Sequence, residues 1–236
     1  MNLAKPNLDM GVFVRNLESE LFFWQTKVSI PFDHRLHIKK PITNKEFFQY
    51  RHNLNGSVIK INHCVTLKPD NPEERSGFKG VTLILGNSKK KLETANGEFI
   101  EILPENTNDL QGPIIHLTSE KPNRLIDFYV SVLGFEKITS ELIRSGTSYL
   151  QITKGSSGNS GESYLGYGFR YITVQVFDAD LECQKIEQKG GDVAMQPVSY
   201  GKIARVAFVR DPDGNWIEIS ARSSLTGVEP PSDPKN

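Results

Sequence analysis

The chain of 236 residues has only two cysteines, no net charge and no long apolar run. Cys64 and Cys183 lie far apart, outside any CxxC pattern or Cys/His cluster, which favours two buried thiols in a reducing compartment over a disulfide or zinc site. No stretch approaches the roughly twenty apolar residues that span a bilayer, and residues 1–8 lack the apolar core of a signal peptide. We therefore expect a cytoplasmic location and no contact with a membrane.

Charge of one sign is also absent over any long stretch. The 28 basic and 28 acidic residues are interspersed, so the sequence has no broad basic surface for nucleic acid. The C-terminal stretch 225–236 contains three prolines and few apolar residues. Such a segment buries too little surface to order itself, and we predict a disordered tail there.

The second half of the chain reads as two similar runs of secondary structure. In the first run, periodicity predicts a strand, a helix and two strands, at 113–118, 123–133, 136–143 and 149–153. Gly134 stands where a helix commonly ends. In the second run, the same reasoning predicts a strand, a helix and a hairpin, at 169–176, 179–188, 205–209 and 216–220. The glycine- and serine-rich stretch 155–161 between the runs predicts a flexible loop, either a lid or a linker.

The first half repeats this layout in shortened form. We predict strands at 8–14 and 32–38, a helix at 18–28, and a strand pair turned at Asn55-Gly56. Gly77–Leu83 matches Gly168–Val174 in letters, and Asn96–Ile102 matches Asp213–Ile219, which indicates a duplication. Only residues 85–95 lie between the two N-terminal segments, too few for a full module. We therefore predict a reduced domain over 1–111 and a complete one over 112–224.

Three segments of the second half carry a more specific pattern. They are Asn123–Tyr129 leading to Val132–Phe135, then Gly168–Val176, and above all Ala207–Ile219, which reads AFVRDPDGNWIEI. This pattern resembles the vicinal oxygen chelate superfamily, which includes glyoxalase I, extradiol dioxygenases and the bleomycin resistance proteins. The resemblance implies an α+β fold of tandem domains, in which paired βαβββ modules form curved, sheet-lined clefts.

In that superfamily, four strands each contribute one ligand to a divalent metal ion. The resemblance places Glu218 at the final-strand position, Gln151 at the second and Tyr171 at the third, where His is usual. A phenol is a poor ligand for a divalent metal. Ungapped alignment puts Ile114 at the first position, with His116 two residues on and on the same strand face.

The equivalent positions of the first half are Asp9, Lys60, Gly80 and Glu101. A lysine beside two carboxylates indicates a former metal site that is now ion-paired. A metal catalyst needs about three protein ligands and an open position, so we expect no cofactor. The alternative is one divalent ion of iron, manganese, nickel or zinc, held by Glu218, Gln151 and His116.

The cleft of the second half is the expected site of function. We expect a lyase or isomerase activity on a small carbonyl or aromatic substrate, with Glu218 as general base and Tyr171 as hydrogen-bond donor or acid. One alternative is a non-catalytic protein that sequesters its ligand, as resistance proteins of the superfamily do, and another is an extradiol dioxygenase.

The expected partner is a small-molecule ligand, and a homodimer is feasible. The expected substrate contacts are Tyr149, Gln151, Trp216 and Arg205.

Overall fold

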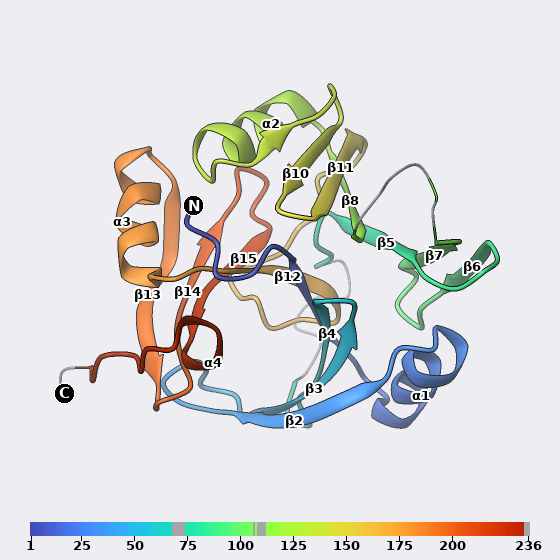
Figure 1. The fold of residues 1–236 in the computed structure, drawn as a ribbon, viewed down its shortest axis with the longest axis horizontal. Helices are drawn as coiled ribbons and strands as arrows, with labels where there is room; N and C mark the ends of the chain where they lie inside the picture. Colours follow the sequence, from blue (N-terminus) through green and yellow to red (C-terminus); the bar gives the residue numbers. More distant parts are fainter. Residues whose placement is uncertain (68–73, 106, 108–111, 234–236) are drawn as a thin grey trace.

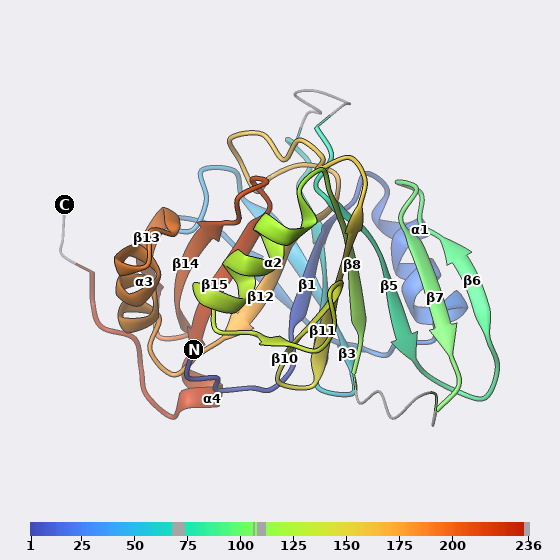
Figure 2. The same ribbon diagram turned by 90° about the horizontal axis from the view of Figure 1, so that it is seen from above.

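Two curled β-sheets with helices on their outer faces make up the molecule (Figure 1). A computed structural model describes residues 1–67, 74–105, 107 and 112–233. Figure 2 shows β13 to β15 at one end of the molecule and β5 to β7 at the other. The mixed sheets and few helices confirm the α+β class.

The first sheet has eight strands in the order β13-β14-β15-β12-β1-β4-β3-β2. Four come from the start of the chain and four from its end: β1 (Asp9–Phe13), β2 (Phe32–Ile38), β3 (Phe47–Leu54), β4 (Ser57–His63), β12 (Gly168–Gln175), β13 (Asp192–Tyr200), β14 (Ala204–Arg210) and β15 (Trp216–Arg222). The Tyr200 hydroxyl on β13 donates to the carbonyl of His37 on β2. The two edges of this sheet therefore approach each other around its concave face.

The second sheet has seven strands in the order β6-β7-β5-β8-β11-β10-β9. These strands come from the middle of the chain: β5 (Phe78–Ile84), β6 (Lys90–Glu93), β7 (Phe99–Leu103), β8 (Ile114–Ser119), β9 (Glu136–Lys137), β10 (Leu142–Ser145) and β11 (Ser148–Lys154). No helix joins β5 to β7 in the part of the chain that the structure describes. The segment between β5 and β7 therefore contains only the short strand β6.

The pairing of the modules differs from the sequence-based expectation. Sequence reasoning joined neighbouring modules, whereas β1 pairs antiparallel with β12 and β5 pairs antiparallel with β8. Each sheet therefore takes strands from both sides of residue 112. Residues 108–111 lie outside the described residues, and the division into 1–111 and 112–224 stays a prediction.

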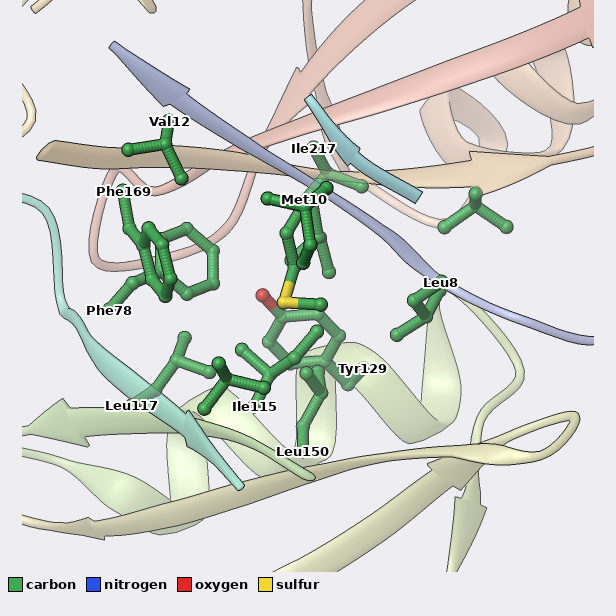
Figure 3. Packing of buried hydrophobic residues seen from close by; sticks show 14 of the residues in the cluster. Leu8, Met10, Val12, Phe78, Ile115, Leu117, Tyr129, Leu150, Phe169 and Ile217 are labelled. Atoms are coloured by element: carbon green, nitrogen blue, oxygen red, sulfur yellow. The ribbon is translucent and has the colours of Figure 1, made fainter. Parts of the chain in front are cut away.

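The helices α1 (Leu17–Phe22), α2 (Pro122–Ser131), α3 (Ala179–Gln188) and α4 (Ser223–Thr226), with the π-helical turn η1 (Phe23–Lys27), accompany the sheets. The main core lies between the convex faces of the two sheets. In Figure 3, Leu8, which directly precedes β1, and Met10 of β1 point toward Ile115 of β8 and Tyr129 of α2. The sequence predicted the two longer helices closely, because each has an apolar stripe and a glycine soon after its last turn.

One predicted turn is confirmed, and one strand was missed. The turn at Asn55-Gly56 is confirmed, since both residues have positive φ, 44° and 97°, as a two-residue hairpin requires. Strand β13 was missed, because its sequence, DVAMQPVSY, contains a proline and few residues with a strong preference for strands.

The loop before β12 covers one end of the concave face of the first sheet. The buried Arg170 guanidinium donates to the carbonyls of Tyr164, Glu74, Ser160 and Ser163, which holds this loop in place. The Tyr164 ring stacks on Phe208 of β14 with 4.2 Å between centroids. This loop contains the stretch 155–161 that was predicted as a lid or linker, and its Tyr164 supplies part of a cleft wall.

The C-terminal tail follows β13 as far as the structure describes it. The Ser199 amide donates to the Asp233 carboxylate at 2.7 Å, and the Arg205 guanidinium also pairs with Asp233. None of the helices in the described ranges has the length and apolar character needed to cross a bilayer.

Gly11 of β1 lies directly against the Tyr171 ring of β12. A Cβ atom at this position would lie 2.1 Å from Cζ of Tyr171, whose ring occupies the space above the glycine. We predict that Gly11→Ala lowers the free energy of unfolding by about 1–3 kcal/mol, because it overpacks this contact. Urea denaturation measures the change.

The Tyr171→Ala background is the control for this prediction. With the ring removed, Gly11→Ala should cost clearly less than it does in the unmodified chain. Equal losses in both backgrounds would show that the Tyr171 ring is not what requires glycine at position 11.

Candidate functional site

The concave face of the first sheet holds a cleft between β2–β4 and β12–β15, which we call the main cleft. Its apolar lining comes from β2, β3, β13, β14 and three loops, and consists of Leu36, Ile38, Ile42, Phe47, Tyr164, Tyr200, Ile203, Ala204, Val206 and Phe208. Its polar lining consists of Gln49, Arg51, Lys60, Tyr171, Glu218, Ser220 and Arg222. The main cleft thus has an apolar side, formed by the first set, and a charged side, formed by the second.

Strand alternation aims Glu218 into this cleft. Its neighbours Ile217 and Ile219 are fully buried in the core between the sheets, so Glu218 points to the opposite face, as predicted. In the strand pairing, Glu218 stands directly beside Thr173 of β12. The Thr173 hydroxyl donates to Glu218 Oε2 at 2.8 Å.

Lys60 from β4 is the third member of this group. Its Nζ donates to Thr173 Oγ1 and to Glu218 Oε2, both at 2.6 Å. Gly11 of β1 stands beside Lys60 in the sheet, so the lysine side chain crosses β1 to reach β12 and β15. The ion pair is buried, with side-chain exposures of 2% for Lys60 and 12% for Glu218.

Burial changes the protonation chemistry of this group. Desolvation of the Lys60 amine lowers its pKa, and the Glu218 carboxylate opposes this shift by favouring the ammonium form. Desolvation raises the pKa of the Tyr171 phenol well above its ordinary value, and the nearby Glu218 charge adds to that effect. Tyr171 is therefore a neutral hydroxyl at physiological pH.

The Tyr171 hydroxyl accepts hydrogen bonds from two amides. Asn62 Nδ2 donates to it at 3.2 Å and Gln49 Nε2 at 3.4 Å. Its own proton makes no hydrogen bond to any residue that the structure describes. The hydroxyl proton of Tyr171 is therefore not committed to a described protein acceptor, and its role as donor or acid stays a prediction.

Gln151 and His116 lie elsewhere, which corrects the expectation that they join Glu218. They stand side by side on β11 and β8 of the second sheet. There, His116 Nε2 is 2.8 Å from Thr82 Oγ1, and Thr82 donates to Glu101 at 3.2 Å. The cause is the pairing of the modules. The third module, which contains His116 and Gln151, pairs with the second through β8 and β5, whereas the fourth, which contains Glu218, pairs with the first through β12 and β1.

Two expected substrate contacts also lie outside the main cleft. Tyr149 is on β11 of the second sheet. Arg205 is on β14, but it points to the outer face and pairs with Asp180 of α3 and with Asp233. Trp216 does lie on the concave face, where it packs against Phe208 below the lining.

Comparisons with known proteins agree with this architecture. The sequence profile described as "Glyoxalase/Bleomycin resistance protein/Dioxygenase superfamily" matches residues 114–219. The lactoylglutathione lyase of Neisseria meningitidis serogroup A is 31% identical over 113 residues, which is 42% of this chain and 81% of that protein. The enzyme of the same name from Escherichia coli O157:H7 is 36% identical over 110 residues, 41% of this chain and 81% of that protein. This chain belongs to the glyoxalase superfamily.

The likeness extends over the whole fold. Glyoxalase I from Zea mays superposes with a TM-score of 0.67 over 94% of this chain and 95% of that one, at 11% identity. At so low an identity the superposition shows a shared fold and no more. The glyoxalase-like fold and the superfamily suggested by the sequence are thereby confirmed.

Membership of the glyoxalase superfamily implies a metal site, and the residues of the main cleft can be tested against it. The four corresponding positions in the first sheet are Asp9, Lys60, Tyr171 and Glu218. Lys60 supplies a positive charge where a ligand is needed, and it already occupies the Glu218 carboxylate. Asp9 is bonded to Lys5 and to the Val58 amide. This donor set does not fit a divalent metal ion.

The second sheet offers a different set. Its four positions hold Ile114, Gln151, Gly80 and Glu101, with His116 beside them. Across the described ranges, no three His, Cys, Asp or Glu side chains are arranged to hold a metal ion.

Several cleft residues were missed by sequence reasoning. Arg222 was recoverable, because it is four residues after Glu218 and so on the same strand face. Thr173 was recoverable in the same way from Tyr171. Arg51 and Gln49 were not, because only the pairing of β3 with β4 and of β1 with β12 brings them to Glu218.

The Lys60–Glu218 pair yields a stability prediction. Lys60→Met should lower the free energy of unfolding by about 3 kcal/mol, because it leaves the Glu218 carboxylate buried without its cation. Lys60→Met combined with Glu218→Gln should recover most of that loss, since both charges are then gone. Lys202→Met removes an exposed lysine from its pair with Glu229 and should change little. Additive losses in the double variant would contradict a direct Lys60–Glu218 coupling.

His116 yields a pH prediction. Burial lowers its pKa from 6.5 to about 4. Between these pH values His116 binds a proton in the unfolded chain but stays neutral in the folded chain. This contribution to stability is complete above pH 6.5 and is lost as the pH falls toward 4. His116→Gln should flatten that part of the curve. Burial raises the pKa of Asp211 to about 6, with the opposite effect, so the wild-type-minus-variant difference is the quantity to measure by urea denaturation.

Proposed function

We propose that this chain is a metal-independent enzyme of the lyase or isomerase type, which moves a proton at the carbon beside a carbonyl group in the main cleft. One observation carries the proposal. The Lys60 ammonium takes the place of a metal ligand and binds Glu218 Oε2, 2.6 Å away, in a buried cleft that also contains the Tyr171 hydroxyl.

The charges in the cleft suit the chemistry of an enolate. A metal ion would polarise the substrate oxygen as a Lewis acid, and a buried ammonium beside a hydroxyl donor can stabilise the same developing negative charge. We assign these two roles to Lys60 and Tyr171. Both residues are almost fully buried, and hydrogen bonds to a developing charge are stronger in such surroundings than in solution.

Glu218 is the proposed base. The hydrogen bonds that it accepts from described residues all reach Oε2, which leaves Oε1 for a substrate proton. Oε1 takes the proton from carbon, the electron pair moves into the enolate, and the same carboxyl group returns the proton to a neighbouring atom or assists loss of a leaving group. Lys60 and Thr173 hold the carboxylate in position throughout.

A second candidate function is capture of a ligand without chemistry. The stack of Tyr164 on Phe208, with Trp216 and Tyr171 edge-on to it, forms an aromatic wall along one side of the cleft. Such a wall can hold a planar ligand by stacking. The two candidates differ in turnover, which the experiment below measures.

The remaining expectations stay proposals. We retain a cytoplasmic location, a small-molecule ligand, no nucleic-acid or membrane partner, and a possible homodimer. We do not carry forward the extradiol dioxygenase alternative, because the donor set of the main cleft does not fit the metal ion on which that chemistry depends. Elemental analysis of protein purified without chelator should accordingly find no stoichiometric iron, manganese, nickel or zinc.

The decisive assay is exchange of substrate C–H for C–D. The protein is incubated in D₂O with a panel of small 2-oxo acids, hydroxyketones and aldehydes, and proton signals are followed by NMR. We expect exchange with at least one compound, and we expect Glu218→Gln to slow it by about 10²- to 10⁴-fold, as loss of a general base does.

Glu101→Gln is the matched control, because Glu101 holds the equivalent position in the second sheet. It should leave the exchange rate unchanged. Exchange that survives in Glu218→Gln, or that requires an added divalent metal, would refute the catalytic proposal. Tight binding of a panel member with no exchange at all would favour capture.

A further inference from the structure

Arg51 on β3 is a buried cation whose partners do not neutralise it. Its side chain is only 5% exposed and it lines the main cleft. Its Nη1 donates to Gln49 Oε1 at 2.9 Å, a neutral acceptor. Its Nε is fully buried and makes no hydrogen bond to any residue that the structure describes. A buried guanidinium with an unmet donor costs stability unless a ligand supplies the acceptor.

The neighbours of Arg51 increase this cost. Lys60 stands directly opposite it in the β3–β4 pairing, so two buried cations face each other across adjacent strands. Arg222 is close enough for the Arg51 charge to add to the lowering of its pKa by burial. The lining thus has three cations, Arg51, Lys60 and Arg222, against the single carboxylate of Glu218.

No carboxylate that the structure describes forms a hydrogen bond or ion pair with Arg51 or Arg222, and Asp9 acts on both only through its charge. Asp9 is the other buried carboxylate near Lys60, and it is engaged by Lys5, the Val58 amide and Gln175. The Glu218 carboxylate is engaged by Lys60 and Thr173. Arg51 and Arg222 are therefore available to an anion that enters the cleft.

We propose that Arg51 and Arg222 form an anion subsite of the main cleft, which selects a small aromatic compound bearing an anionic oxygen group, either a carboxylate or a phosphoryl group. A guanidinium matches both groups, because its planar fork donates two parallel hydrogen bonds. The aromatic body of the ligand lies against Phe208 and Tyr164.

This inference rests on the proposed function and names its substrate class. With the anionic group held by Arg51 and Arg222, the adjoining part of the ligand lies toward Lys60, Tyr171 and Glu218. The site would thus bind the anionic group of the substrate at one end and act on its carbonyl group at the other.

Titration calorimetry with benzoate, phenylphosphonate and the neutral isostere benzamide tests the subsite. We expect benzoate or phenylphosphonate to bind and benzamide to bind much more weakly, and the tighter of the two anions identifies the oxygen group. Arg51→Gln and Arg222→Gln should each raise the Kd of that anion by about 10- to 100-fold, the loss of a charge-assisted hydrogen bond. Arg35→Gln, which removes an exposed arginine from β2, should bind like the unmodified chain.

A thermal unfolding measurement separates a binding role from a structural one. Because Arg51 is a buried charge with no hydrogen-bonded carboxylate among the described residues, ligand-free Arg51→Gln should unfold at the same or a higher temperature than the unmodified chain. A lower Tm with unchanged anion binding would overturn the proposal, as would equal binding of benzoate and benzamide or no binding of either anion.

The two proposals fail in different ways. If benzoate binds through Arg51 and no carbonyl compound exchanges its protons, the anion subsite stands and the catalytic proposal fails. If exchange depends on Glu218 but shows no preference for anionic compounds, the catalytic proposal stands and the anion subsite fails. Glu218→Gln should retain benzoate binding in either case.

Discussion

The antiparallel pairing of β1 with β12 is the constraint on which the rest of the structure depends. It joins the first module of the chain to the last, and it forces the two middle modules to pair with each other. Gly11 makes this junction possible, because the Tyr171 ring occupies the space that any side chain there would need.

The main cleft follows from that junction. Neither half of the chain could build it, because Lys60, Arg51 and Gln49 come from the first module, whereas Tyr171, Glu218 and Arg222 come from the last. The result is a buried ion pair beside two arginines that have no hydrogen-bonded carboxylate among the described residues, with an aromatic wall opposite. In the function that we propose, the Lys60 ammonium supplies hydrogen bonding and charge in place of Lewis-acid assistance.

The duplication indicated by the sequence relates the two sheets, but the polar side chains at their corresponding positions differ. Thr82 and Glu101 of the second sheet correspond to Thr173 and Glu218 of the first, and both threonines bond their glutamates. His116 on β8 of the second sheet corresponds to Gly11 on β1 of the first. His116 lies beside Gln151 of β11, and Gly11 lies beside Lys60 of β4. The two glutamates therefore have different surroundings, which is why Glu101 serves as a control for Glu218.

The sequence by itself determined the local elements, the superfamily and the direction of Glu218. Apolar periodicity fixed α2 and α3, Asn55-Gly56 fixed a hairpin, and alternation along β15 placed Glu218 on the face away from Ile217 and Ile219. These properties depend on residues near one another in the chain. Only the tertiary structure decided that Glu218 meets Lys60 and that Gln151 meets His116, because strand pairing between distant modules is set by the packing of whole sheets, which no local pattern encodes.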